Sequence, residues 1–215
     1  MMGDTLRYEA ERRRRLVRVL APLSICVAAV LFVATAVSCG SSKAIALDPY
    51  TLQRSDLGAH FKQKAAHPVP NALAIKQGTS AATVRRYGRV GGYERQFRAR
   101  GLAPNLRGIK SRVVATRTAA GSHGAFLYSI ARTGVGLSKR NSIHRLVLPR
   151  VGSESRCYYL DDTRVDARVY FCIWRQGRLI GELFISGFLE DAGPALLRPF
   201  ERILNKQASR MASFR

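Results

Sequence analysis

The histidines are the first side chains to consider for chemistry, and one of them lies in Gly121-Ser122-His123-Gly124. A serine beside an imidazole offers a nucleophile and a general base for acyl transfer. Adjacent residues at the start of a helix point apart, however, so Ser122 and His123 are poorly placed for that reaction. No histidine has metal-ligand spacing such as HxxxH. We therefore expect His123 to be an ordinary helix residue, with no catalytic residue, metal or other cofactor.

The carboxylates do not form an acid/base pair in sequence either. Asp161 and Asp162 lie beside an expected turn, where aspartate is common for conformational reasons. Glu190 and Asp191 precede an expected helix, where they suit the helix dipole. The glycine-rich run 134–139 lacks the GxxxxGK[ST] spacing of a phosphate loop. No catalytic set is identified, and an envelope-acting hydrolase whose residues converge only in the fold stays open as the alternative.

The cysteines separate into a lipidation candidate and a disulfide pair. Cys39 follows Ala36-Val37-Ser38, which resembles a lipobox, and Gly-Ser-Ser follows it. Cys157 and Cys172 form the pair in the folded part, and one hairpin register places them opposite each other. The same register pairs Tyr159 with Tyr170, an aromatic pair that stabilises a sheet. We predict a structural disulfide rather than a redox-active pair, because CxxC proximity is absent.

The first 50 residues have the layout of an export signal and its tether. Residues 1–18 form a basic cytoplasmic head that contains Arg12–Arg15, and 19–38 form an uncharged apolar run. Two interpretations remain open. The first is a cleaved signal with a lipidated Cys39; the second is an uncleaved transmembrane helix, because 20 apolar residues can span a bilayer. The four arginines also permit a twin-arginine signal. Residues 39–50 are the expected tether and 51–215 the exported domain, located at the cell membrane on its extracytoplasmic side.

The chain is strongly basic, with a net charge of +22. The densest stretch is 85–117, which contains ten Arg or Lys against Glu94 alone. Such a field attracts anions, and outside the cell these are lipid headgroups or wall polymers rather than nucleic acid. The aromatics Tyr87, Tyr93 and Phe97 interleave with the cations; the competing interpretation is that they are core residues beneath a solvated face. The candidate anion-binding residues are Arg85, Arg86, Arg89, Arg95, Arg98, Lys110 and Arg112.

The hydrophobic patterns predict an α+β domain, an antiparallel sheet with helices packed on one face. The second hairpin is expected to turn at Gln176-Gly177, which pairs Trp174 with Leu179 and places Gly181 opposite Cys172. We expect helices at 80–87, at 118–132 and from near Pro194 onward. In the second of these, Phe126, Leu127 and Ile130 should form the buried stripe. The expected strands are 93–98, 109–117, 143–148, the hairpin 157–172, and 178–186.

Residues 108–206, and above all Phe171-Cys172-Ile173-Trp174-Arg175-Gln176-Gly177-Arg178-Leu179-Ile180, resemble small exported domains of bacteria. The similar proteins are anchored lipoproteins and the extracellular sensor-like domains of membrane serine/threonine kinases. The resemblance implies binding or sensing rather than catalysis. We expect a membrane-anchored exported domain that binds an anionic lipid, a cell-wall polymer or a partner protein.

Overall fold

The computed structural model describes residues 45–100, 106–138, 143–163, 165–189 and 194–214. Residues 45–215 cluster into one compact unit, separate from 1–44. The basic head, the apolar run 19–38 and Cys39 therefore lie outside the described residues. Within the described part, no helix is long and apolar enough to cross a membrane.

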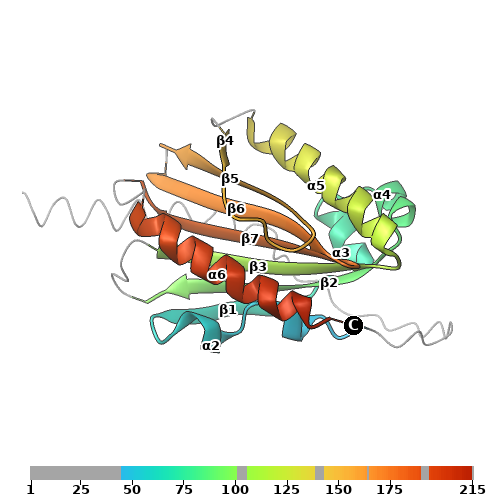
Figure 1. Ribbon diagram of the computed structural model, residues 1–215, viewed down its shortest axis with the longest axis horizontal. Coiled ribbons are helices and arrows are strands. Elements are labelled where there is room, and N and C mark those ends of the chain that lie inside the picture. The colour runs from blue at the N-terminus through green and yellow to red at the C-terminus, as the bar shows by residue number, and fades with distance from the viewer. Residues whose placement is uncertain (1–44, 101–105, 139–142, 164, 190–193, 215) are drawn as a thin grey trace, which may run out of the picture. The chain divides into compact units, whose positions relative to one another are not determined.

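A seven-stranded antiparallel sheet forms the centre of the domain, with strand order β1-β2-β3-β7-β6-β5-β4 (Figure 1). This confirms the α+β class. The outer strands are short or polar and carry exposed lysine or arginine, which discourages edge-to-edge association. The strands are β1 Phe61–Pro68, β2 Arg89–Ala99, β3 Leu106–Thr116, β4 Ile143–Leu146, β5 Glu154–Asp162, β6 Ala167–Gln176 and β7 Leu179–Phe188.

Two long helices cover the sheet, α5 (Ala119–Ser138) and α6 (Pro194–Ala212), with α6 running across one face in Figure 1. The apolar side chains of α6 pack on Leu183 and Trp174, whereas Phe126 of α5 packs on Ile173. Because Ile173 and Trp174 are neighbours on one strand, they point to opposite faces. The helices thus lie on both faces, and the prediction of a single covered face is wrong. The short elements are η1 Asp48–Tyr50, α2 Arg54–Leu57, α3 Asn71–Lys76 and α4 Ala81–Arg86.

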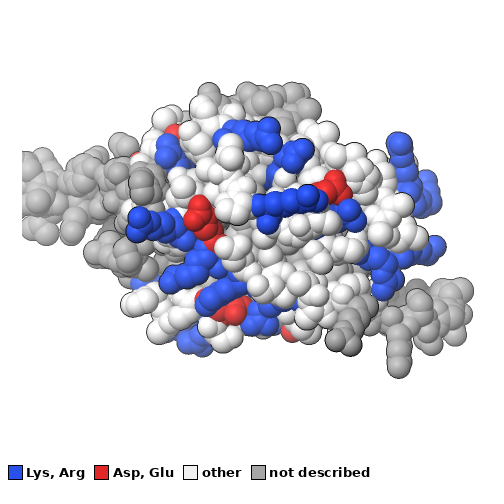
Figure 2. All heavy atoms as spheres, viewed as in Figure 1, with Lys and Arg blue, Asp and Glu red and all other residues white. Residues whose placement is uncertain are grey.

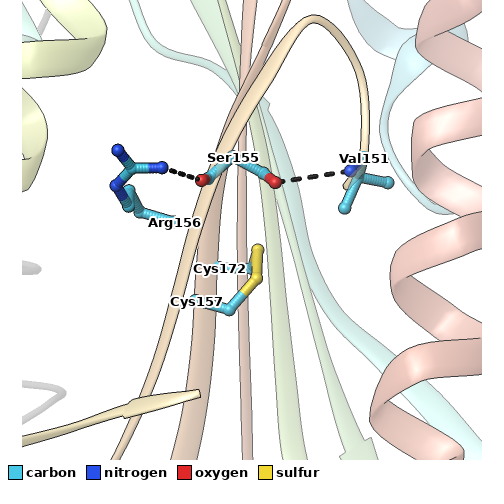
Figure 3. Close-up of a disulfide and its surroundings, with 5 residues drawn as sticks. All are labelled: Val151, Ser155, Arg156, Cys157 and Cys172. Atoms are coloured by element: carbon cyan, nitrogen blue, oxygen red, sulfur yellow. Dashed lines mark hydrogen bonds between the residues drawn. A yellow bond between two sulfur atoms is a disulfide. The ribbon is translucent and has the colours of Figure 1, made fainter. Parts of the chain in front are cut away.

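The first hairpin has the predicted register. Cys157 lies opposite Cys172 and the two are disulfide-bonded, while Tyr159 faces Tyr170. The sulfur atoms lie on the side of the sheet that faces α6, together with Val151, and Arg156 points to the other side (Figure 3). The bond is buried, which fits the structural role predicted from the sequence.

The second hairpin differs from its predicted register by two residues. Gln176 pairs with Leu179 around a Gly177-Arg178 turn, and Trp174 pairs with Gly181 rather than with Leu179. Gly177 has a φ of 57°, which a glycine adopts without cost. A Cβ at position 181 would overlap the Trp174 ring, so this glycine makes room for the indole and not for the sulfur of Cys172.

The N-terminal part of the domain contains the elements that the sequence patterns missed. Strand β1 alternates poorly because only Phe61 is buried at its start, and the chain packs into the core before residue 51, with Leu47 buried. Leu127 of the expected α5 stripe is instead 51% exposed, so the buried stripe contains Phe126 and, partly, Ile130. The other expected helices and strands are present, with shifted ends.

Candidate anion-binding surface

The basic segment 85–117 folds into α4, β2 and β3, which places its cations on two faces of the sheet. Glu94 and Arg98 of β2 share a face with Lys110 and Arg112 of β3, since Glu94 pairs with Arg112 and Arg98 with Gly108. Arg95 belongs to the opposite face, where Phe97 is buried in the core beneath α6. The segment is therefore not one continuous basic surface.

Arg112 is bound by carboxylates. Its Nε donates to Oε2 of Glu94 at 2.7 Å, and Oε2 of Glu182 lies 3.9 Å from the guanidinium. The Glu94 side chain is only 4% exposed. Burial alone would raise the pKa of Glu94, but Arg112, Lys110 and a hydrogen bond from Gln96 together hold it below its ordinary value. Conversely, burial would lower the pKa of Arg112, and the two glutamates outweigh it. This pair is a structural ion pair, not a free anion site.

Arg89 and Arg95 also serve the fold. Arg89 donates to Oδ1 of Asn71 at 2.6 Å and to the carbonyl of Val69 at 2.8 Å. Burial and the neighbouring Arg112 lower the pKa of Arg89 to about 10. Arg95 forms an ion pair with Asp48, which fastens η1 to the sheet. Arg89 thus joins β2 to the segment at Val69 and Asn71, and Arg95 joins β2 to η1.

The remaining candidates fall into two groups. Arg85 and Arg86 are exposed at the end of α4, and the Arg86 guanidinium lies 5.5 Å from the Tyr87 ring. Arg98 is exposed on the sheet, diagonal to the half-buried Lys110, and directly opposite Lys62 of β1. Lys62 was missed in the sequence because β1 was not recognised as a strand. We name Lys62, Arg98 and Lys110 the sheet-end cluster; none forms an ion pair with a residue that the structure describes.

Of the three interleaved aromatics, Phe97 is buried, whereas Tyr87 and Tyr93 are half-buried, and the Arg95 guanidinium lies 5.9 Å from the Tyr93 ring. Phe97 is 3% exposed, and Tyr87 packs on Tyr128 with ring centroids 6.1 Å apart. A different aromatic row lies next to the cluster, where Phe184 is stacked on Phe171 with centroids 5.7 Å apart. Its other neighbour is Lys110, whose Nζ lies 4.9 Å from the Phe184 centroid. Lys110 is thus held in place by a cation–π contact.

His123 has an acid partner that the sequence did not reveal. Its Nδ1 lies 2.9 Å from Oε1 of Glu154, which also accepts from Arg175 at 2.6 Å. Burial would raise the pKa of Glu154, but these hydrogen bonds lower it. Ser122 is buried and donates to the carbonyls of Ala119 and Gly177, so it is not a nucleophile for His123. Across the described residues, no group of three or more His, Cys, Asp or Glu is arranged for a metal ion.

The sequence matches no family model and no curated protein. The fold is similar to that in the crystal structure of the extracellular domain of PknH from Mycobacterium tuberculosis, with a TM-score of 0.51 and 12% sequence identity. The similarity covers 76% of this chain and 95% of that one. It confirms, at the level of the fold, the resemblance to the extracellular sensor-like domains of membrane serine/threonine kinases.

Proposed function

We propose that this chain is a membrane-anchored, exported, non-catalytic domain that binds an anionic component of the cell envelope through the sheet-end cluster. The fold similarity to an extracellular domain supports the extracytoplasmic location. The apolar run 19–38 and Cys39 supply the anchor, by lipidation or by an uncleaved helix.

The observation that carries this proposal is the direct pairing of two like charges on adjacent strands. Lys62 and Arg98 face each other across β1 and β2, and like charges in this position destabilise a sheet. Lys110 adds a third charge on the same face of β3. A bound phosphate or carboxylate group would offset the repulsion between Lys62 and Arg98 through charge-assisted contacts, and Lys110 would add to the attraction for the anion. The nearest buried carboxylate, Glu94, is already occupied by Arg112.

The proposal is tested by replacing Lys62, Arg98 and Lys110 with glutamine in the exported part, residues 45–215. Binding to purified anionic wall polymer and to anionic vesicles is measured across a salt series, which separates the two ligand sources. We expect binding to weaken as salt rises and to fall at least tenfold in the variant. The matched control neutralises Lys76, Arg85 and Arg86 on α3 and α4. Equal losses in both variants would show that only overall charge matters and would refute the proposed site.

A further inference from the structure

A second basic surface lies on the opposite face of the sheet, along the outer side of α6. The inner side of this helix is buried, including Phe200, Leu204 and Met211. On the outer side, Arg198, Arg202 and Lys206 follow each other at intervals of four residues and are exposed. Residues four apart lie on one side of a helix, so their charges form a stripe. Figure 2 shows Lys and Arg spread over the face that α6 crosses.

The acidic groups near this stripe offset only part of its charge, since the Asp56 carboxylate interacts more with Arg210 than with Lys206. Asp56 is bound in two-point fashion by Arg210, with Nε–Oδ2 and Nη2–Oδ1 distances of 2.8 and 2.9 Å. Lys206 donates instead to the main-chain carbonyl of Asp56, at 2.9 Å. This contact brings α2, with its exposed Arg54, against α6. Glu201 is the carboxylate of α6 itself, and it forms no ion pair with a described residue.

We name Arg54, Arg198, Arg202 and Lys206 the α6 surface. Its four cations outnumber the one carboxylate, Glu201, that no described cation binds. Charge attracts an anionic surface over about 8 Å at physiological salt, so such a surface acts only on a partner held close to it.

The described chain enters the domain beside this surface. η1 contacts α6, the Tyr50 ring packs edge-on against Phe214 with centroids 5.1 Å apart, and Arg210 reaches the Pro49 carbonyl. Six residues, 39–44, lie between the end of the apolar run at Ser38 and Ile45. Even fully extended, the seven residue-to-residue steps from Ser38 to Ile45 span at most about 25 Å. An anchor at Ser38 or Cys39 would therefore keep this side of the domain close to the lipid headgroups.

We infer that the α6 surface docks on the anionic phospholipid leaflet in which the chain is anchored. The inference rests on the membrane anchoring in the proposed function, but not on the sheet-end cluster. Because the tether holds the domain beside the leaflet, docking is an intramolecular step that even a few charges can drive. Each Lys or Arg near an anionic leaflet favours the docked state by about fivefold. Docking by α6 leaves the opposite sheet face, with the sheet-end cluster, turned away from the membrane.

The test uses the full-length chain reconstituted in vesicles through its own N-terminal segment. One vesicle set contains phosphatidylcholine alone and the other contains phosphatidylglycerol as well; both carry a lipid with a photoreactive headgroup. Cross-linked peptides are located by mass spectrometry. We expect the peptides of α2 and α6 to be labelled several-fold more in the phosphatidylglycerol vesicles, and this excess to disappear at high salt.

The variant R198E/R202E/K206E should lose the whole of this phosphatidylglycerol-dependent excess, since each charge favours the docked state by about fivefold. The control K76E/R85E/R86E changes the net charge equally on α3 and α4 and should leave the labelling unchanged. Formation of the Cys157–Cys172 disulfide in each variant confirms that it is folded. Even labelling of all peptides, labelling concentrated on α3 and α4, or labelling that the α6 variant does not reduce would overturn the inference.

The same preparation separates failure of this inference from failure of the proposed function. A chain that does not float with either vesicle set has no membrane anchor, which rejects the anchoring and the docking together. A chain that floats but shows no α6 labelling rejects the docking alone. Glutamine at Lys62, Arg98 and Lys110 should leave the α6 labelling unchanged, because those residues lie on the other face; a large loss there would also reject docking through α6.

Discussion

Replacing Glu94 by glutamine tests whether the Glu94–Arg112 pair is structural. The carboxylate accepts from Arg112 at Oε2 and from Gln96 at Oε1, at 2.7 and 2.6 Å, and it is almost fully buried. A glutamine at this position has an NH2 group in place of one carboxylate oxygen. That NH2 group would face the N–H of either Arg112 or Gln96, so one of the two hydrogen bonds would be lost. Hydrogen bonds to charged groups contribute about 1.5–3 kcal/mol each, and a broken buried pair costs about 3–5 kcal/mol. Because Arg112 is 21% exposed and keeps Glu182 nearby, we expect a loss at the lower end of the second range, about 3 kcal/mol.

The assay is urea unfolding of residues 45–215, with Glu182→Gln as the matched control. Glu182 approaches the same arginine only to 3.9 Å, so its replacement should cost less than about 1 kcal/mol. The two variants change the same charge in the same row of the sheet. Equal losses, or a loss below about 0.5 kcal/mol for Glu94→Gln, would refute the view that this carboxylate locks Arg112 into the fold.

The pH dependence gives an independent check on the same residue. The folded pKa of Glu94 lies below its ordinary value of 4.5, so the unfolded chain binds the proton more tightly. The stabilising contribution is therefore complete above about pH 5 and is lost as the pH falls through the folded pKa. The difference between the wild type and Glu94→Gln should shrink below pH 4.5. A constant difference down to the folded pKa would contradict the assigned shift.

Three further changes test other parts of the molecule. Replacing both Cys157 and Cys172 by alanine should cost about 3 kcal/mol in urea unfolding, and non-reduced peptide mapping of the wild type should show the two peptides joined. Gly181→Ala should lower the free energy of unfolding by about 1–3 kcal/mol, because the new Cβ would overlap the single tryptophan of the chain. In the control Gly91→Ala the new Cβ meets nothing within 4 Å, so stability should change little. Tryptophan fluorescence follows the unfolding of both variants. Cys39→Ala should abolish labelling by radioactive palmitate if the chain is a lipoprotein, and membrane attachment that persists in that variant would indicate the uncleaved helix instead.

The parts of the fold that the sequence predicted are those in which several residues agree on one arrangement. The first hairpin brings together two cysteines and two tyrosines, and only one register satisfies both pairs. The second hairpin offered one strong cue, Gly177, which is compatible with a turn at either of two positions. The packing of the Trp174 ring determines which turn forms, because only the residue without a Cβ, Gly181, fits next to the ring. That requirement is a tertiary packing effect, and no local pattern contains it.

Strand β1 and the placement of the helices on both faces were not predicted, for a related reason. Strand β1 is an edge strand whose side chains are mostly exposed, so the alternation that identifies a half-buried strand is weak. Its loss from the prediction also hid Lys62, and with it the like-charge pair on which the proposed function depends. The assignment of both helices to one face overlooked a different signal: Tyr170–Trp174 is apolar at five consecutive positions, as expected for a strand covered on both sides.

The density of arginine along the sequence does not predict which surface of the domain is basic. The few carboxylates neutralise some of the described arginines and leave others unpaired, and the fold determines which. Arg95, Arg112, Arg168 and Arg210 each have a carboxylate partner, and these pairs join segments up to 154 positions apart. Pairing at such separations depends on the finished fold, so composition cannot reveal it. Many cations of the described residues have no carboxylate partner. Two groups of them, the sheet-end cluster and the α6 surface, lie on opposite faces of the sheet. A domain tethered by a short segment beside one of these faces can use that face for the membrane while the other stays open to an anionic ligand.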